Sequence, residues 1–144
     1  MADNASGETH VASNPIDSAA SPFQLDAGND TLGVWVQILG SSDTPARAGM
    51  TKFDLHKIQI VASQETGAAA FIQISIGATA AAGLSAGDYT TIAYFTPTNV
   101  ASETPINVMM RRVAVGSKVW ARCVAVGENT MTIDFYIGLH EYPG

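Results

Sequence analysis

The side chains with the greatest chemical potential in this chain are one cysteine and three histidines. Catalysis by a thiol needs a base within reach and an electropositive setting, and His56 or His140 would have to supply that base. Cys123 alternates with Ala121 and Ala125 in the run VWARCVAV, which predicts that it points into a packed face of small residues. We therefore expect a buried cysteine without a nucleophilic role, and no catalytic residue.

Carboxylates and imidazoles recur at a spacing of two residues, which raises the question of a metal site. Asp54 and His56 share one strand face, and Asp134, Tyr136 and His140 share another. Side chains two positions apart on a strand lie about 7 Å apart, so the two sets would have to meet in the folded protein. Because metal sites usually show tighter His/Cys clusters, we expect no metal and no other cofactor. Polar contacts on an outer sheet face or at a subunit interface are the alternative.

Aromatic residues offer a third chemistry, a platform on which sugar rings stack. The candidates are Trp35, Tyr89, Tyr94, Trp120, Tyr136 and Tyr142. Trp35 and Trp120 lie inside alternating runs, which favours packing in the core or at an interface. The loops expected at 41–50, 78–88 and 97–104 contain no Trp, Phe or Tyr, which argues against a sugar site built from these loops.

The elements that must position these residues are short strands. Alternating residues closed by Gly or Pro predict strands at 34–39, 52–63, 70–77, 89–95, 106–113, 117–126 and 130–140. In the second of these the apolar parity changes after Leu55, which predicts a bulge near His56 and Lys57. About seven strands and no convincing helix predict an all-β fold, an antiparallel jelly-roll sandwich of about seven to eight strands. The eighth strand would come from the N-terminal segment or from residues 41–51.

One uncharged stretch, residues 67–87, is long enough to span a bilayer. Its strongly apolar residues are few, and Ile72, Ile74 and Ile76 alternate with Gln73 and Ser75. This pattern is typical of a strand followed by an Ala/Gly loop, so no membrane contact is expected.

Charge divides the chain into two parts. Residues 1–30 contain five acids and no Lys or Arg, whereas residues 31–144 contain eight acids and all seven basic residues. We therefore predict an extended acidic N-terminal arm over 1–30 and a β-sandwich body over 31–144. Isolated apolar residues in the arm are candidate anchors on a partner surface, namely Val11, Ile16, Phe23 and Leu25. An arm folded back on its own body is the alternative.

The bulk composition bears on partners. Only 14% of the residues are charged, against about 25% in typical soluble domains, which fits a surface covered by copies of the chain or by a partner. The acidic balance argues against nucleic acid, because neutralising phosphates needs clustered cations. The densest basic region holds Arg111, Arg112, Lys118 and Arg122 on one predicted hairpin.

The segments PINVMMRRVAVGSKVWARCVAV and TIDFYIGLHEYPG resemble the closing strands of jelly-roll virion proteins of tailed bacteriophages, of the capsid decoration or cement type. The resemblance covers residues 105–144 and extends to 34–95 only in rhythm. It implies a jelly roll that forms trimers and an N-terminal extension that docks onto a capsid shell.

These observations together predict a non-enzymatic phage structural protein that decorates and stabilises the capsid. Its partners would be the major capsid protein or another virion protein and further copies of itself, with a homotrimer favoured. It would lie on the capsid exterior after assembly in the host cytoplasm. The candidate interface residues are Trp35, Arg111, Arg112, Trp120 and Arg122. The alternative is a tail- or fibre-tip module that recognises a host surface glycan, and a cupin-like enzyme would need a clustered His/carboxylate metal set.

Overall fold

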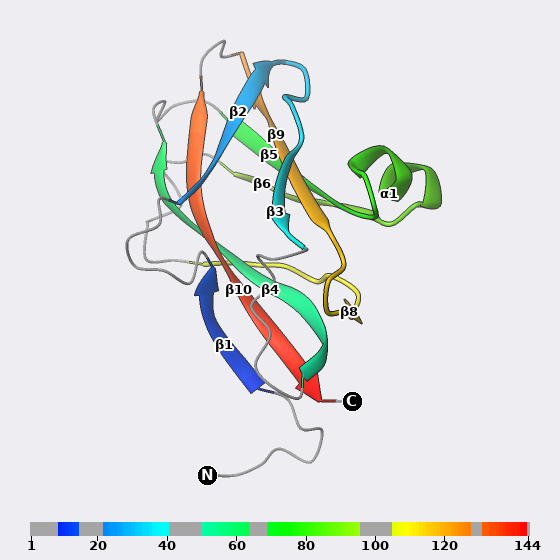
Figure 1. Ribbon diagram of the computed structural model, residues 1–144. Coiled ribbons are helices and arrows are strands. Elements are labelled where there is room, and N and C mark those ends of the chain that lie inside the picture. The colour runs from blue at the N-terminus through cyan, green and yellow to red at the C-terminus, as the bar shows by residue number, and fades with distance from the viewer. Residues whose placement is uncertain are drawn as a thin grey trace.

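The computed structural model describes residues 9–14, 22–40, 50–63, 69–95, 105–127 and 131–143. Within these ranges the chain forms ten strands and one short helix (Figure 1). In chain order they are β1 (Thr9–Asn14), β2 (Phe23–Asn29), β3 (Val36–Leu39), β4 (Met50–Ser63), β5 (Ala69–Ile76), α1 (Ala80–Ala86), β6 (Tyr89–Phe95), β7 (Ile106–Asn107), β8 (Val113–Ala114), β9 (Val119–Val126) and β10 (Thr132–Pro143). The all-β prediction is confirmed at this level.

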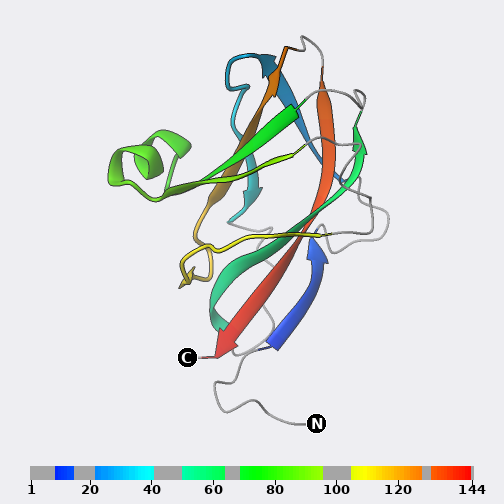
Figure 2. The same cartoon turned by 180° about the vertical axis from the view of Figure 1, so that it is seen from behind.

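The strands form one curled, mixed sheet. Its main order is β6-β5-β9-β2-β10-β4-β7, while β1 pairs with β10, β3 with β9 and β8 with β4. The prediction of a purely antiparallel sheet is wrong, because β2 and β9 pair in parallel. The long strands β10 and β4 run side by side through the length of the molecule (Figures 1 and 2).

Strand β2 joins the two halves of the sheet. Its first part pairs antiparallel with β10, with Leu25 opposite Ile133, and its second part pairs in parallel with β9, with Ala27 opposite Cys123. Leu25 is fully buried. Residues 23–29 are therefore part of the sheet, as in the alternative of a strand supplied by the N-terminal segment.

The core lies on the inner face of the curled sheet. On β9 the buried side chains are Val119, Ala121, Cys123 and Ala125, and on β10 they include Ile133, Phe135, Ile137 and Leu139. The predicted bulge is confirmed, since Gly138 pairs with Lys57 and Leu139 with Leu55, which leaves His56 as the extra residue. The bulge lets apolar residues of opposite parity on β4 face the same core.

The short helix α1 was not predicted from the sequence, which indicated an Ala/Gly loop at this position. The Thr79 side chain caps the helix by accepting a 3.1 Å hydrogen bond from the Ala82 N–H, and Gly87 ends it with a φ of 74°. Buried Ser75 on β5 donates a 2.9 Å hydrogen bond to the Ala80 carbonyl. Seven residues are too few for the hydrophobic period to reveal a helix. In the described part of the chain, no helix combines the length and the apolar character needed to cross a membrane.

Candidate functional site

The outer face of β9 gathers three of the five predicted interface residues. We define the β9 outer face as Trp35, Gln73, Trp120, Arg122, Val124 and Val126. The Arg122 guanidinium carbon lies 4.2 Å from the Trp35 ring centroid, and its Nε donates a 2.8 Å hydrogen bond to Gln73 Oε1. Trp120 Nε1 donates a 3.0 Å hydrogen bond to the Gly77 carbonyl. This face therefore carries aromatic, aliphatic and guanidinium groups held in fixed positions.

Exposed aliphatic side chains border this face. The Gly33 N–H donates a 2.8 Å hydrogen bond to the Cys123 carbonyl, which holds the chain before β3 along β9. Leu32 and Val34 on either side of Gly33 are 42% and 68% exposed, and Val126 within the face is 45% exposed. Burial lowers the pKa of Arg122, because partial removal from water disfavours the charged guanidinium.

Directly beneath this face, Cys123 is fully buried, as the alternation predicts. Burial raises the pKa of its thiol to about 12, and the negative charge of Asp26 adds to the shift. At neutral pH the side chain is therefore a protonated thiol within a packed face of small residues.

The structure brings together two polar sets that the sequence keeps apart. His140 Nδ1 lies 3.4 Å from Asp54 Oδ1, the Tyr142 hydroxyl donates a 2.5 Å hydrogen bond to Asp54 Oδ2, and the His56 and His140 rings stack at 4.0 Å. Arg112 covers the Tyr142 ring at 3.3 Å. We call these five side chains the histidine cluster. It ties the C-terminal half of β10 to β4 and to the segment before β8.

The two sets of carboxylate and imidazole side chains that share a strand face in the sequence meet only in part. Asp134 lies at the other, N-terminal end of β10, where its Oδ1 accepts a 2.8 Å hydrogen bond from Gln24 Nε2. Across the ranges that the structure describes, no three His, Cys, Asp or Glu side chains are grouped so as to hold a metal ion. The pKa of Tyr142 is raised, first by burial and then by its hydrogen bond to Asp54, and Arg112 opposes that shift. The arrangement suits a structural polar network.

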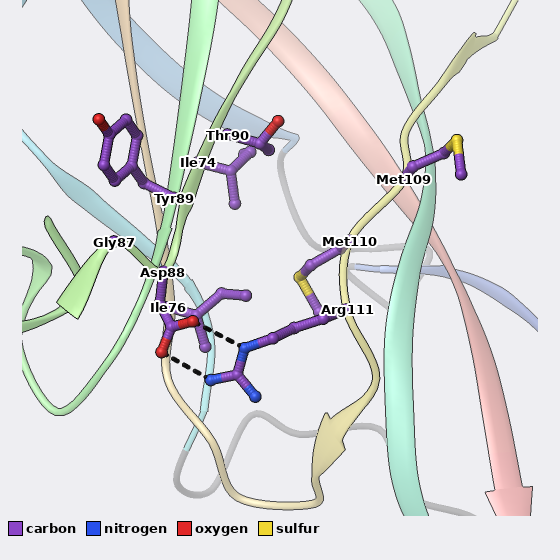
Figure 3. Close-up of a pocket in the computed structure, with 9 residues that line it drawn as sticks. All are labelled: Ile74, Ile76, Gly87, Asp88, Tyr89, Thr90, Met109, Met110 and Arg111. Carbon is purple, nitrogen blue, oxygen red and sulfur yellow. Dashed lines mark hydrogen bonds and ion pairs between the residues drawn. The ribbon is translucent and has the colours of Figure 1, made fainter.

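The two edges of the curled sheet face each other across a seam. One edge is β6, and the other is the chain from β7 to β8. Between them lies a cavity of about 150 Å³, lined by Ile74, Ile76, Gly87, Asp88, Tyr89, Thr90, Met109, Met110 and Arg111 (Figure 3). Arg111 Nε and Nη2 donate hydrogen bonds of 2.9 and 2.8 Å to the two carboxylate oxygens of Asp88. This ion pair joins the edges.

The predicted anchors have different positions in the structure. Leu25 lies in the core, and Phe23 packs against Phe135 with ring centroids 5.6 Å apart, so both side chains are used in packing within the chain itself. Both alternate with polar Gln24 and Asp26, the period of a half-buried strand. Val11 lies in β1, and Ile16 is outside the described residues.

Asp88 and Met109 were not predicted as site residues. Asp88 is the only charged residue between Glu65 and Glu103, and an isolated charge in a neutral run is a signal for a specific partner. Met109 is an apolar residue at an outward position between buried Val108 and Met110, and only the structure shows it to be 95% exposed.

No family model, no curated protein and no solved structure matches this chain.

Proposed function

We propose that this chain is a non-enzymatic structural protein of a tailed-phage virion, a jelly-roll module that decorates and stabilises the capsid and self-associates through its body. The observation that supports it most is the β9 outer face with its exposed border. Protein interfaces are enriched in Trp and Arg, and their hot spots combine such anchors with aliphatic surroundings. Trp35, Trp120 and Arg122 provide these anchors next to Leu32 and Val34.

A second copy of the chain is the occupant proposed for this face. The face presents a single cation, Arg122, which is already held by Trp35 and Gln73, so little charge has to be desolvated on association. A trimer, the form that the resemblance implies, requires the face to meet a different surface on the next copy. Low overall charge, 14% of residues, fits a body that is partly covered in the assembly.

Attachment to the capsid is proposed for the residues ahead of β2. Phe23 and Leu25 pack within the sheet, and residues 9–14 pair with β10, so the acidic segment proposed to contact the major capsid protein is shorter than the predicted arm. Its charge would complement a basic partner surface and accelerate encounter.

Co-sedimentation with undecorated phage capsids tests the proposal. We expect saturable binding of the full-length protein, and sedimentation velocity should show an oligomer that Val34→Asp dissociates. Tyr89→Ser is the matched control, because Tyr89 is also half-exposed but lies on the seam. A monomer that does not bind capsids would contradict the proposal.

One observation favours the alternative, a tail- or fibre-tip module for a host glycan. Tyr89 is 50% exposed beside the Asp88–Arg111 pair, and an aromatic ring next to fixed polar groups suits a sugar. Binding to a glycan array that Tyr89→Ser abolishes, without capsid binding, would support this alternative.

A further inference from the structure

The seam is an interruption in an otherwise continuous curl of strands. Strand β6 pairs with β5 on one side, and among the described strands it has no partner on the other. On the opposite edge, β7 pairs with β4 at Asn107 and Lys57, and β8 resumes at Val113 and Phe53. Between these pairs β4 advances four residues and the facing chain six. Residues 109–112 therefore loop away from β4 instead of extending its ladder.

Unpaired sheet edges are sites where another strand adds. A row of backbone N–H and C=O groups offers hydrogen bonds to an extended segment, and proteins usually protect such edges. Here the protection across the seam is the Asp88–Arg111 pair, whose side chains are 34% and 55% exposed. Exposed ion pairs are weak, so a competing carboxylate can take over Arg111 at little cost.

The cavity in the seam provides a place for one apolar side chain. Its floor is formed by Ile74 and Ile76 of β5 and by Met110, all buried. A volume of about 150 Å³ is comparable to the apolar cavities that take up one benzene-sized group. At the rim, Met109 and Tyr89 are 95% and 50% exposed, so an incoming residue meets apolar surface before it enters.

The charges beside the cavity select the partner. A second hollow of about 360 Å³ also borders the ion pair and is lined by Arg111 and Lys118 together with Asp88, Ser117, Ile76 and small residues. Cations exceed acids in this region, although the whole chain carries a formal charge of −6. An acidic segment is therefore the complementary partner.

We propose that the seam binds an extended acidic segment of a partner protein. The segment adds a strand beside β6, places one aliphatic side chain in the cavity above Ile74 and Ile76, and directs a carboxylate at Arg111 and Lys118. This role is separate from self-association through the β9 outer face, because it uses the sheet edge at β6 and not the outer face of an internal strand.

The test is an NMR titration of the ¹⁵N-labelled full-length protein with an eight-residue acetylated peptide, Thr-Asp-Thr-Leu-Glu-Thr-Asp-Thr. We expect saturable amide shifts confined to Tyr89–Phe95 and to residues 109–112. Replacing the peptide's Leu by Ser should weaken binding at least about tenfold, since it removes the buried aliphatic group. Replacing the acidic residues of the peptide by Lys should weaken binding further. Added salt should weaken binding of the acidic peptide by screening its attraction to the cations, and this effect should be lost in the Lys peptide.

Two protein variants complete the test, and each replaces an exposed apolar residue by Asp. Met109→Asp adds a negative charge at the rim of the cavity at a side chain that is 95% exposed, so folding should be preserved. Val34→Asp makes the same change at a 68% exposed site bordering the β9 outer face. We expect Met109→Asp to reduce peptide affinity at least about tenfold and Val34→Asp to leave it unchanged.

Several outcomes would overturn the inference. Shifts that map to the β9 outer face, equal effects of the two variants, or indifference to the peptide's Leu would each do so. Concentration-dependent shifts of the same amides without peptide would assign the seam to a second copy of the chain. Shifts produced only by an oligosaccharide would assign it to a glycan. Failure here leaves the capsid assay and the Val34→Asp dissociation test unaffected, so the two proposals fail separately.

Discussion

Neighbouring strands are held together differently on the closed side of the curled sheet, which is formed by β9 and its partners, and across the seam. On the closed side, β9 lies between β5 on one side and β2 with β3 on the other, and alternate residues such as Ala121 and Cys123 are fully buried. Across the seam, two strand edges are joined by a partly exposed ion pair over a cavity. The comparison shows that continuous pairing with small, regularly alternating side chains builds the stable wall, and that an interrupted edge leaves groups for a partner.

The largest expected effect tests the closed side. Leu25→Ala removes a fully buried side chain at the point where β2 passes from β10 to β9, and it should lower the free energy of unfolding by about 2–5 kcal/mol. Leu32→Ala, at a 42% exposed side chain, should cost less than about 0.5 kcal/mol. Urea denaturation of both variants measures the difference. If both variants lowered the free energy of unfolding by the same small amount, residues 23–29 would belong to an arm and not to the sheet, and the comparison would lose its basis.

Sequence patterns predicted the closed side better than the seam, for physical reasons. The alternation in β9 and β10 and the bulge at His56 could be predicted locally, because a strand with one buried face has apolar residues at every second position. Strand β2 was assigned to the arm, since its charge and its neighbours masked a short Phe23, Leu25, Ala27 alternation. Its parallel pairing with β9 leaves no local signal at all.

The seam and the histidine cluster form only in the tertiary structure, from residues far apart in the sequence. Asp88 and Arg111 are 23 positions apart and Asp54 and Tyr142 are 88 positions apart, so no spacing rule joins them. The strand predicted over 106–113 is split into β7 and β8, because the chain loops out opposite the bulge of β4. Among the seam residues, the sequence indicates Arg111 for its charge and Tyr89 for its aromatic ring, but no local pattern relates the two.

A pH experiment sharpens the description of the closed side. Burial holds the pKa of Cys123 at about 12 in the folded chain, whereas an unfolded cysteine has a pKa of about 8.5. The unfolded chain therefore loses its thiol proton first, so stability is full below about pH 8.5 and falls as pH rises towards 12. Between pH 8 and 10, wild type should lose roughly 1–2 kcal/mol more than Cys123→Ala, measured by urea denaturation. Parallel pH curves for the two proteins would show that the thiol is hydrated.

Substitution in the histidine cluster should lower the free energy of unfolding less than substitution in the core and more than substitution in the seam. Tyr142→Phe removes the hydrogen bond to Asp54 while keeping the ring beneath Arg112. Because Asp54 loses a buried donor, we expect a cost of about 1–3 kcal/mol. Tyr89→Phe, at a half-exposed ring, should be neutral in the same thermal or urea unfolding experiment. A neutral Tyr142→Phe would show that water replaces the phenol and that the cluster does not clamp β10 to β4.

The smallest expected effect lies in the seam and is the most informative about it. A double-mutant cycle of Asp88→Asn and Arg111→Ala should give a coupling energy of only about 0.2–1 kcal/mol, since both side chains are partly exposed. The coupling should shrink in 1 M salt, while amide exchange in Tyr89 and Thr90 accelerates in either variant without a change in global stability. A coupling above about 2 kcal/mol would mean that the pair closes the sheet as firmly as packing does. In that case a partner carboxylate could not displace Asp88, and the seam would be as firmly closed as the side formed by β9.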